Sequence, residues 1–443
     1  MMQFRDAHDN LVTAASAEAV AALDATVSAY LGFRADTGDR LKAAYAADPD
    51  LPLAHVLRGC FMLLFGRRAM VPRAQAALDA AQGAAARAAL TPREEAHIEA
   101  LAAWVAGDLV GATRGWEALA AEHPRDILAL KLGQYGCFYM GESARMRGVI
   151  ERGLAAWDES IPDYPFLLGC HAFGLEETGD YTQAERAGRA AVEKNPSDIW
   201  AAHAVAHVCE MTGRAQDGAA WIGGLAANWR QCNNFAYHAL WHRCLFLIEL
   251  GEPERALDLY DREVRPESSD DLLDIANAVS LLWRLEAEGV DVGNRWQELG
   301  ERAEAHIEDH LLTFGDIHYV MALAAAGKDE ALDRMLESLE RHAATSPESE
   351  AAVANEPGLA LARAVVAHRR GEWVEAADRL LSVRERIWRI GGSHAQRDLF
   401  EEMLIDAALR AGRRSEAQAL LARRREARPG NEWGRRRLHR LAG

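Results

Sequence analysis

The stretch GDYTQAERAGRAAVEKNP, from Gly179 to Pro196, decides the fold of this chain. It begins with a glycine, carries alanine five and twelve positions later, and ends with a proline seventeen positions later. Glycine lets the chain leave a preceding helix in a left-handed conformation, and small residues let the next helix approach its neighbours closely. Proline then ends that second helix. The stretch therefore predicts the second half of a helical hairpin.

The same glycine recurs along the chain, which indicates an internal repeat. Ten glycines follow one another at intervals of 34 to 44 residues: Gly66, Gly107, Gly141, Gly179, Gly213, Gly251, Gly289, Gly327, Gly371 and Gly412. Two of these intervals equal the 34 residues of a tetratricopeptide repeat. Apolar residues recur at three- and four-residue spacing and β-branched runs are rare, so we expect no strand. The sequence thus predicts an all-α fold, a tetratricopeptide-like α-α superhelix in which about nine or ten hairpins form a single solenoid over residues 1–443.

Composition and charge exclude several classes of protein. The chain has 443 residues, of which 49% are hydrophobic and 26% charged, and its net charge is −17. So many apolar residues exclude wholesale disorder, and no apolar run approaches the roughly 20 residues of a membrane span. Asp6 and Asp9 stand where a secretory signal would carry positive charge. An acidic chain repels phosphate backbones, so we expect no binding of nucleic acid. The lack of a membrane span and of a secretory signal predicts a cytoplasmic protein that binds no membrane.

Residues 410–443 depart from this acidic balance, because they hold eleven arginines and three glutamates. We assign them to an Arg-rich C-terminal hairpin and tail that belong to the solenoid. These arginines could contact an acidic partner or the protein's own acidic surface, but we favour an exposed face of the last helix. The end of an open solenoid leaves apolar faces that need covering, so homo-oligomer formation through a terminal hairpin is a further expectation.

Histidines cluster on three of the predicted first helices of the repeats. If Gly213 is taken as position 15 of its repeat, then positions 2, 5, 9 and 12 are Trp200, His203, His207 and Glu210. Spacings of three, four and three residues place these side chains on one helical stripe, with neighbouring imidazoles about 6 Å apart at Cβ. The next repeat adds His238, Trp241 and His242, and a later one adds Asp309, His310, Asp316 and His318. We expect the three clusters to converge if the array curves around them.

Such clusters offer what a transition-metal ion needs. Neutral imidazoles one helical turn apart are metal ligands, and carboxylates can ligate the ion or orient the imidazoles. A metal-bound water could then serve hydrolysis, with Glu210 as the general base. Histidines on a partly buried helical face are, however, often ordinary hydrogen-bonded packing residues. Both interpretations stay open on the sequence alone.

Other motifs carry weaker signals. GGSHAQRDLFEE, residues 391–402, predicts a glycine-rich turn into a helix, with Ser393 or Asp398 as the cap and Arg397 as an anion clamp, and a plain capped loop is the alternative. TPREEAHIEA, residues 91–100, predicts a helix start. The six cysteines form no C-x-x-C pair, so we expect buried free thiols. The sequence contains no Walker A loop, Rossmann fingerprint, H-E-x-x-H or G-x-S-x-G, which removes the usual support for nucleotide-dependent and serine-hydrolase functions.

Several segments resemble the tetratricopeptide repeat protein 38 family. They are TPREEAHIEA, DIWAAHAVAHVCEMTG, HALWHRCLFLIELGEPERAL, LLWRLEAEGVDVGNRW, DHLLTFGDIHYVMA and GGSHAQRDLF, and they span about residues 91–410. The resemblance implies an all-helical tetratricopeptide-like solenoid, and it implies no settled reaction. It also implies that the family pattern includes the residues His203, His207, Glu210, His238, Trp241, His242, Asp309, His310, Asp316, His318, Arg397 and Asp398.

Two functions are therefore expected. The first is a binding protein whose concave face holds a peptide, a partner segment or a small polar ligand. The second is a metal-dependent enzyme of the hydrolase class that uses the same residues with a divalent ion such as zinc. The candidate ligand-binding residues are Trp200, His203, His207, Glu210, His238, Trp241, His242, Asp316, His318, Arg397 and Asp398. The candidate metal ligands are His203, His207, His238, His242, His310, Asp316 and His318, and Glu210 is the candidate catalytic base.

Overall fold

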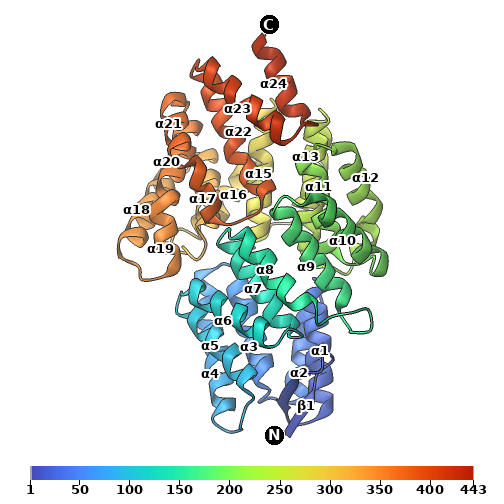
Figure 1. Cartoon of the computed structure of the whole chain (residues 1–443). Coiled ribbons are helices and arrows are strands. Elements are labelled where there is room, and N and C mark those ends of the chain that lie inside the picture. Colours follow the sequence, from blue (N-terminus) through green and yellow to red (C-terminus); the bar gives the residue numbers. More distant parts are fainter. Residues whose placement is uncertain (1, 443) are drawn as a thin grey trace. The chain divides into compact units, whose positions relative to one another are not determined.

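Helices make up almost the whole of the computed structural model, which describes residues 2–442. Residues 1 and 443, the ends of the predicted solenoid and of its Arg-rich tail, lie outside the described part. The first helices are α1 (Ala17–Leu31), α2 (Thr37–Ala47), α3 (Pro52–Leu64), α4 (Val71–Ala85), α5 (Pro92–Val105), α6 (Leu109–Glu122), α7 (Ile127–Tyr139), α8 (Ser143–Leu154), α9 (Tyr164–Glu177), α10 (Tyr181–Lys194), α11 (Ile199–Met211) and α12 (Ala215–Leu225). The later helices are α13 (Phe235–Glu249), α14 (Pro253–Leu259), α15 (Leu272–Ala287), α16 (Arg295–Glu304), α17 (Thr313–Ala325), α18 (Asp329–Thr345), α19 (Ser349–Val353), α20 (Leu359–Arg369), α21 (Trp373–Val383), α22 (His394–Arg410), α23 (Arg414–Ala427) and α24 (Glu432–Ala442). Most of them run as antiparallel pairs (Figure 1), which confirms the predicted all-α, tetratricopeptide-like fold.

The turn glycines predicted from the sequence separate the two helices of each hairpin. All ten adopt positive φ, from 63° at Gly66 to 87° at Gly289. Gly179 thus stands between α9 and α10, and Gly213 between α11 and α12. The ten turns agree with the prediction of about nine or ten hairpins. Within residues 2–442 one further pair, α1 and α2, precedes them, and Phe33 takes the left-handed conformation at its turn (φ 52°).

The expectation of no strand is wrong at the N-terminus. β1 (Met2–Arg5) pairs antiparallel with β2 (Leu11–Ala14). Val12 and Ala14 lie two residues apart on one face of β2, and both are fully buried. The carboxylate of Asp6 accepts two backbone N–H bonds from the turn between the strands, an arrangement typical of an aspartate at the start of a turn. These strands are too short for a periodicity search to separate them from a loop.

The described chain divides into two compact units. Unit 1 comprises Met1–Val205 and Ala227–Phe235, and unit 2 comprises Ala206–Ala226 and Ala236–Gly443. Within each unit, consecutive hairpins pack against one another, as α6 does on α7 and α21 does on α22. The division falls inside α11, so His203 belongs to unit 1 while His207 belongs to unit 2. The predicted continuity of a single solenoid over residues 1–443 stays a prediction.

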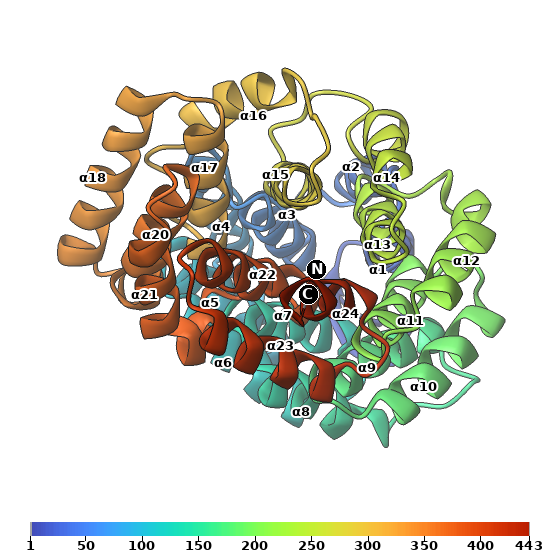
Figure 2. The ribbon, with the colours of Figure 1, turned by 90° about the horizontal axis from the view of Figure 1, so that it is seen from above.

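The last helix of unit 2 returns to one of the first helices of the same unit. The carboxylate of Glu249, at the end of α13, accepts hydrogen bonds from the Asn431 side chain (3.0 Å) and from the backbone N–H of Trp433 (3.2 Å) at the start of α24. Arg436 donates to the backbone oxygens of Glu249 (2.7 Å) and Ile248 (3.1 Å). A carboxylate is stabilised at a helix N-terminus by the N–H groups there. Figure 2 shows α24 beside α13, although these contacts join residues more than 180 positions apart.

The expectation of exposed C-terminal arginines is wrong for three of them. Arg424, Arg428 and Arg437 are at most 8% exposed. Arg424 and Arg428 pair with Asp398, and Arg437 pairs with Glu288 at 2.8 Å. The arginines at 423, 425 and 435 are exposed. The Arg-rich segment therefore contacts acidic residues of its own unit, which was the alternative interpretation.

Two further expectations concern membranes and cysteines. Among the described helices, none is long and apolar enough to cross a membrane. All six cysteines are free thiols. Five of the six are buried and Cys232 is partly exposed, so the prediction of buried free thiols is confirmed for those five.

Candidate functional site

Histidines and a glutamate from α11 and α13 come together in unit 2. The ring centroids of His207 and His242 lie 4.5 Å apart, and those of His238 and His242 lie 4.9 Å apart. His242 Nδ1 lies 3.1 Å from an Oε atom of Glu210. His238 Nδ1 lies 2.8 Å from Oδ1 of Asn277 on α15. Of the first two predicted clusters, the residues that come together within unit 2 are therefore His207, Glu210, His238 and His242.

Arg284, on α15, connects this histidine cluster to the C-terminal helices. Its guanidinium lies 5.7 Å from the centre of the Trp241 ring, a distance at which a cation and an aromatic face attract each other. Its Nε donates to Glu402 on α22 at 3.1 Å. Its other two nitrogens donate to the backbone oxygens of Ser280 and Ala395, both at 3.2 Å. Trp241 itself donates from Nε1 to the Ser280 hydroxyl at 3.1 Å.

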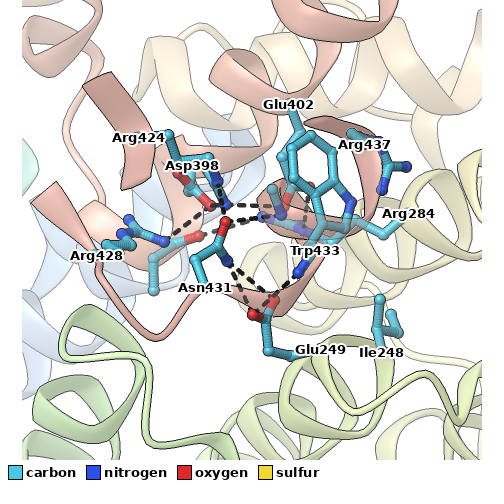
Figure 3. Close-up of polar contacts among 12 residues, drawn as sticks. Ile248, Glu249, Arg284, Asp398, Glu402, Arg424, Arg428, Asn431, Trp433 and Arg437 are labelled. Atoms are coloured by element: carbon cyan, nitrogen blue, oxygen red, sulfur yellow. Dashed lines mark hydrogen bonds and ion pairs between the residues drawn. The ribbon is translucent and has the colours of Figure 1, made fainter. Parts of the chain in front are cut away.

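A network of buried ion pairs lies next to Arg284 (Figure 3). The two terminal nitrogens of Arg424, on α23, each lie 2.6 Å from an oxygen of Asp398 on α22. Arg428 adds a third bond to Asp398 at 3.0 Å. Arg424 Nε donates to the Asn431 side chain at 2.9 Å. Such two-pronged pairs between guanidinium and carboxylate combine charge attraction with a fixed geometry.

These side chains line a cavity of about 40 Å³ in unit 2. A cavity of that size holds a few water molecules or one small charged group. Its polar lining consists of Glu210, Glu249, Arg284, Asp398, Glu402, Arg424, Arg428 and Asn431. Leu245, Phe246, Ile248 and Trp433 contribute apolar surface. Hairpins that are far apart along the chain therefore supply one cavity.

Burial and neighbouring arginines set the charge of the carboxyl groups in this cavity. Burial raises the pKa of Glu402 above its ordinary value, although Arg284 and Arg424 oppose the shift. Burial also raises the pKa of Glu210. Burial alone would raise the pKa of Asp398 as well, but the charges of Arg424 and Arg428 hold it well below its usual range. Asp398 is therefore the permanent anion of the cavity, whereas Glu210 and Glu402 take up protons more readily than exposed glutamates.

The third predicted cluster has neighbours of its own. His310 Nδ1 lies 3.1 Å from Asp316, and His310 Nε2 lies 2.8 Å from the hydroxyl of Ser338 on α18. Asp309 pairs with Nδ1 of His306 at 2.7 Å. These bonds run within the segment before α17 and toward α18. The structure thus brings His310 and Asp316 together, and the expected convergence of this cluster with the one on α11 and α13 stays a prediction.

His318, on α17, is likewise held by its own helix. Its Nδ1 donates to the backbone oxygen of Phe314 at 2.7 Å, and its ring packs against Phe314 with centroids 4.3 Å apart. The ring of Phe400 on α22 lies 6.3 Å away. Burial, aided by the charge of Arg284, lowers the pKa of His318 to about 4. The ring is therefore neutral at pH 7, and its role in ligand binding stays a prediction.

Trp200 and His203 lie in an aromatic group of unit 1. The ring of Trp200 lies 4.8 Å from Phe173 and 5.4 Å from His203, measured between centroids. The ammonium of Lys131, a residue that is 1% exposed, lies 3.8 Å from the centre of the Trp200 ring and 4.7 Å from that of Tyr135. A cation over several aromatic faces is attracted by each of them. Trp200 and His203, both predicted as site residues, therefore belong to this aromatic group of unit 1.

The glycine-rich turn before α22 is built by its own side chains. Ser393 caps α22 in a reciprocal arrangement with Gln396, so Ser393 rather than Asp398 is the cap. Arg397 donates from one nitrogen to the backbone oxygens of Gly391, at 3.3 Å, and Gly392. Arg397 therefore holds the turn, and its role as an anion clamp stays a prediction.

Several residues of the cavity were not predicted from the sequence. Arg284 stands in LLWRLEA, where one arginine interrupts an otherwise apolar stretch of helix. That interruption indicates a buried polar residue and could have identified Arg284. Arg424 and Arg428 had no local signal, because they stand in the run ARRREAR among arginines that are exposed. Glu402 is one of two adjacent glutamates, and spacing alone does not choose between them.

No protein-family model matches this chain. Among solved structures, the chain is similar to the human IFIT1 dimer with PPP-AAAA, with 14% identity, 98% of this chain and 96% of that chain covered, and a TM-score of 0.42. It is also similar to the P58(IPK) TPR domain, with 15% identity, 79% of this chain and 99% of that chain covered, and a TM-score of 0.23. At this identity the similarity concerns the fold alone.

Proposed function

We propose that this chain is a tetratricopeptide-like helical-repeat binding protein whose ligand site is the charged cavity of unit 2. The observation that supports the proposal is the convergence of guanidinium and carboxylate groups from distant hairpins on that cavity. Buried ion pairs are often no more stabilising than apolar residues of the same volume. Stability alone is therefore a poor reason for so many buried charges, and recognition of a charged ligand is a better one.

The size and lining of the cavity favour a small zwitterionic ligand. A volume of about 40 Å³ admits a few water-sized groups and excludes a whole helix or strand. Arg284 and Arg428 suit a carboxylate, and Glu210 and Glu402 suit an ammonium group. A free amino acid, or the charged terminus of a partner segment, carries both groups. A longer peptide would insert its end and lie outside the cavity.

Membership of the tetratricopeptide repeat protein 38 family belongs to the same proposal. The resemblance rests in part on Glu210, His242 and Asp398, which line the cavity or bond to residues that do. Ligand binding would account for polar residues on helices that otherwise bury apolar side chains.

A charge-removing double variant tests the proposal. We expect at least one compound in a panel of free L-amino acids and dipeptides to raise the Tm of the wild-type protein, since a ligand at 100 times its Kd stabilises by about 2.7 kcal/mol. Arg284→Met combined with Glu402→Gln should abolish that shift, because it removes one cation and one anion of the lining. Thermal melts with and without each compound measure the effect.

The matched control changes an ion pair at the surface. Arg295 and Asp261 pair at 2.6 Å with side chains that are 28% and 45% exposed, and Arg295→Met with Asp261→Asn makes the same change of charge. This control should keep the full shift. Equal shifts in the wild type and the cavity variant, or no shift of the wild type by any compound of the panel, would contradict the proposal.

A further inference from the structure

Three imidazoles of unit 2 face one point from two helices. His207 comes from α11, and His238 and His242 come from α13, where they stand one helical turn apart. One ring nitrogen of each of the three residues lies within 4.8 Å of one ring nitrogen of each of the others. The three residues are 0%, 3% and 0% exposed, respectively. Three imidazoles packed this closely away from water form a donor set of nitrogen atoms.

Imidazole binds a metal ion in its neutral form. A neutral imidazole carries a lone pair on one nitrogen, which is the atom that a metal ion binds.

Hydrogen bonds on the outer side of two rings fix which nitrogen carries that lone pair. His238 Nδ1 lies 2.8 Å from the Asn277 carbonyl oxygen, so Nδ1 holds the proton and Nε2 is the lone-pair nitrogen. His242 Nδ1 lies 3.1 Å from the Glu210 carboxylate, and the same argument assigns Nε2. Histidines that bind metals usually donate their other N–H to a carboxylate or a carbonyl oxygen in this way. Asn277 and Glu210 are therefore partners of the kind that hold histidines in metal sites.

We infer that His207, His238 and His242 bind one divalent transition-metal ion, zinc in the first place. The inference rests on the proposed function and deepens it, because it places a metal ion beside the charged cavity, with Glu210 bonded to His242 and lining that cavity. Nitrogen donors favour Zn²⁺, Co²⁺, Ni²⁺ and Cu²⁺ over Mg²⁺ and Ca²⁺. Three protein ligands leave a fourth position for water or for a ligand.

The spacing of the donors is compatible with zinc after small side-chain movements. Tetrahedral zinc with bonds of 2.0–2.1 Å to nitrogen holds its donors about 3.3 Å apart. Donors that already lie within 4.8 Å of one another need to move by only about 1.5 Å to reach that spacing.

Metal binding by the full-length protein tests the inference. After removal of metal by a chelator and dialysis, we expect calorimetric titration with ZnSO₄ to give one equivalent per chain. Titration with CoCl₂ should give the intense visible absorption of tetrahedral Co²⁺. His207→Gln and His242→Gln should each weaken zinc binding at least 100-fold, because each removes a ligand. His342→Gln, which changes a buried histidine on α18 outside the cluster, should leave the affinity within about threefold.

A milder variant keeps the test decisive if a histidine variant fails to fold. Glu210→Gln retains the size of the side chain and removes only the charge that orients His242, so zinc affinity should fall about 10- to 100-fold. Absence of saturable zinc binding in the wild type, or equal affinity in the wild type and in both Glu210→Gln and His242→Gln, would overturn the inference.

The same proteins separate this inference from the proposed function. Arg284→Met with Glu402→Gln leaves all three histidines in place, so it should still bind one zinc per chain while losing the Tm shift by amino acids. Zinc binding without any Tm shift in the wild type would reject the amino-acid ligand and support the metal site. A Tm shift without zinc binding would do the reverse.

Discussion

Replacing Arg424 with methionine is expected to lower the free energy of unfolding by about 3–5 kcal/mol, because it leaves a buried carboxylate without its partner. The side chain of Asp398 is 9% exposed, and Arg424 supplies two of its bonds at 2.6 Å. Arg428 supplies a single further bond at 3.0 Å and does not replace that pair. Urea denaturation of the wild type and the variant, followed by circular dichroism, measures the loss.

The adjacent arginine is a matched control. Arg423 is exposed on the same helix, and Arg423→Met makes the same chemical change one residue away. A surface substitution of this kind usually changes stability by no more than about 0.5 kcal/mol. If the two variants were equally stable, Arg424 would not be the buried partner of Asp398.

A pair of glycine substitutions should show a second large difference. Gly213→Ala is expected to lower the free energy of unfolding by about 2–4 kcal/mol, and Gly179→Ala by about 1 kcal/mol. Both glycines have positive φ, 70° and 83°, so both alanines carry the strain of the left-handed conformation. An added Cβ at Gly213 would lie only 2.5–2.8 Å from backbone atoms of Gly430, whereas at Gly179 it would meet open space. Thermal or urea denaturation of both variants measures the difference.

This comparison also reports on the return of the C-terminal segment to α11. Gly213 and Gly430 both belong to unit 2 and are more than 200 positions apart in the sequence. If the two alanine variants lost the same stability, the chain around Gly430 would not lie against the turn at Gly213. The strain at positive φ would then account for both effects.

Most of the fold could be predicted because its signals are local. A turn glycine, small residues on the following helix and apolar spacing of three and four act within one hairpin, and Gly179 with the ten-glycine series located the turns. The strands β1 and β2 could not be found in this way, because a four-residue strand offers only two alternations. Phe33 was missed for a related reason, since a phenylalanine at positive φ carries no turn signal.

The candidate site could be predicted only where it depends on spacing within one helix. His238 and His242 stand four apart, so their shared face follows from helix geometry. The pairing of Glu210 with His242 depends on how α11 packs on α13, and the repeat register predicted only that the two clusters would converge. The contacts of Arg284 with Glu402 and of Arg424 with Asp398 depend on the return of the C-terminal hairpin. Nothing in the local sequence specifies which of many arginines makes them.

The third cluster shows the limit of the same reasoning. His310 and Asp316 share a segment, and their bond follows from that proximity. The placement of His310 against Ser338 on α18 depends on the loop before α17, where His310 adopts positive φ (44°). A stripe computed on a regular helix does not apply to a residue in such a loop. His318 is on the helix, but its Nδ1 is bonded to the backbone of its own helix.

The central claim is that side chains from distant hairpins of unit 2 line one cavity. The coupling energy between Arg284 and Glu402 tests this claim most directly. A double-mutant cycle with Arg284→Met, Glu402→Gln and the double variant, each unfolded in urea, isolates the contribution of this contact between residues 118 positions apart. A charged hydrogen bond at 3.1 Å predicts a coupling of at least about 1.5 kcal/mol. Additive effects, with a coupling below about 0.5 kcal/mol, would contradict the account.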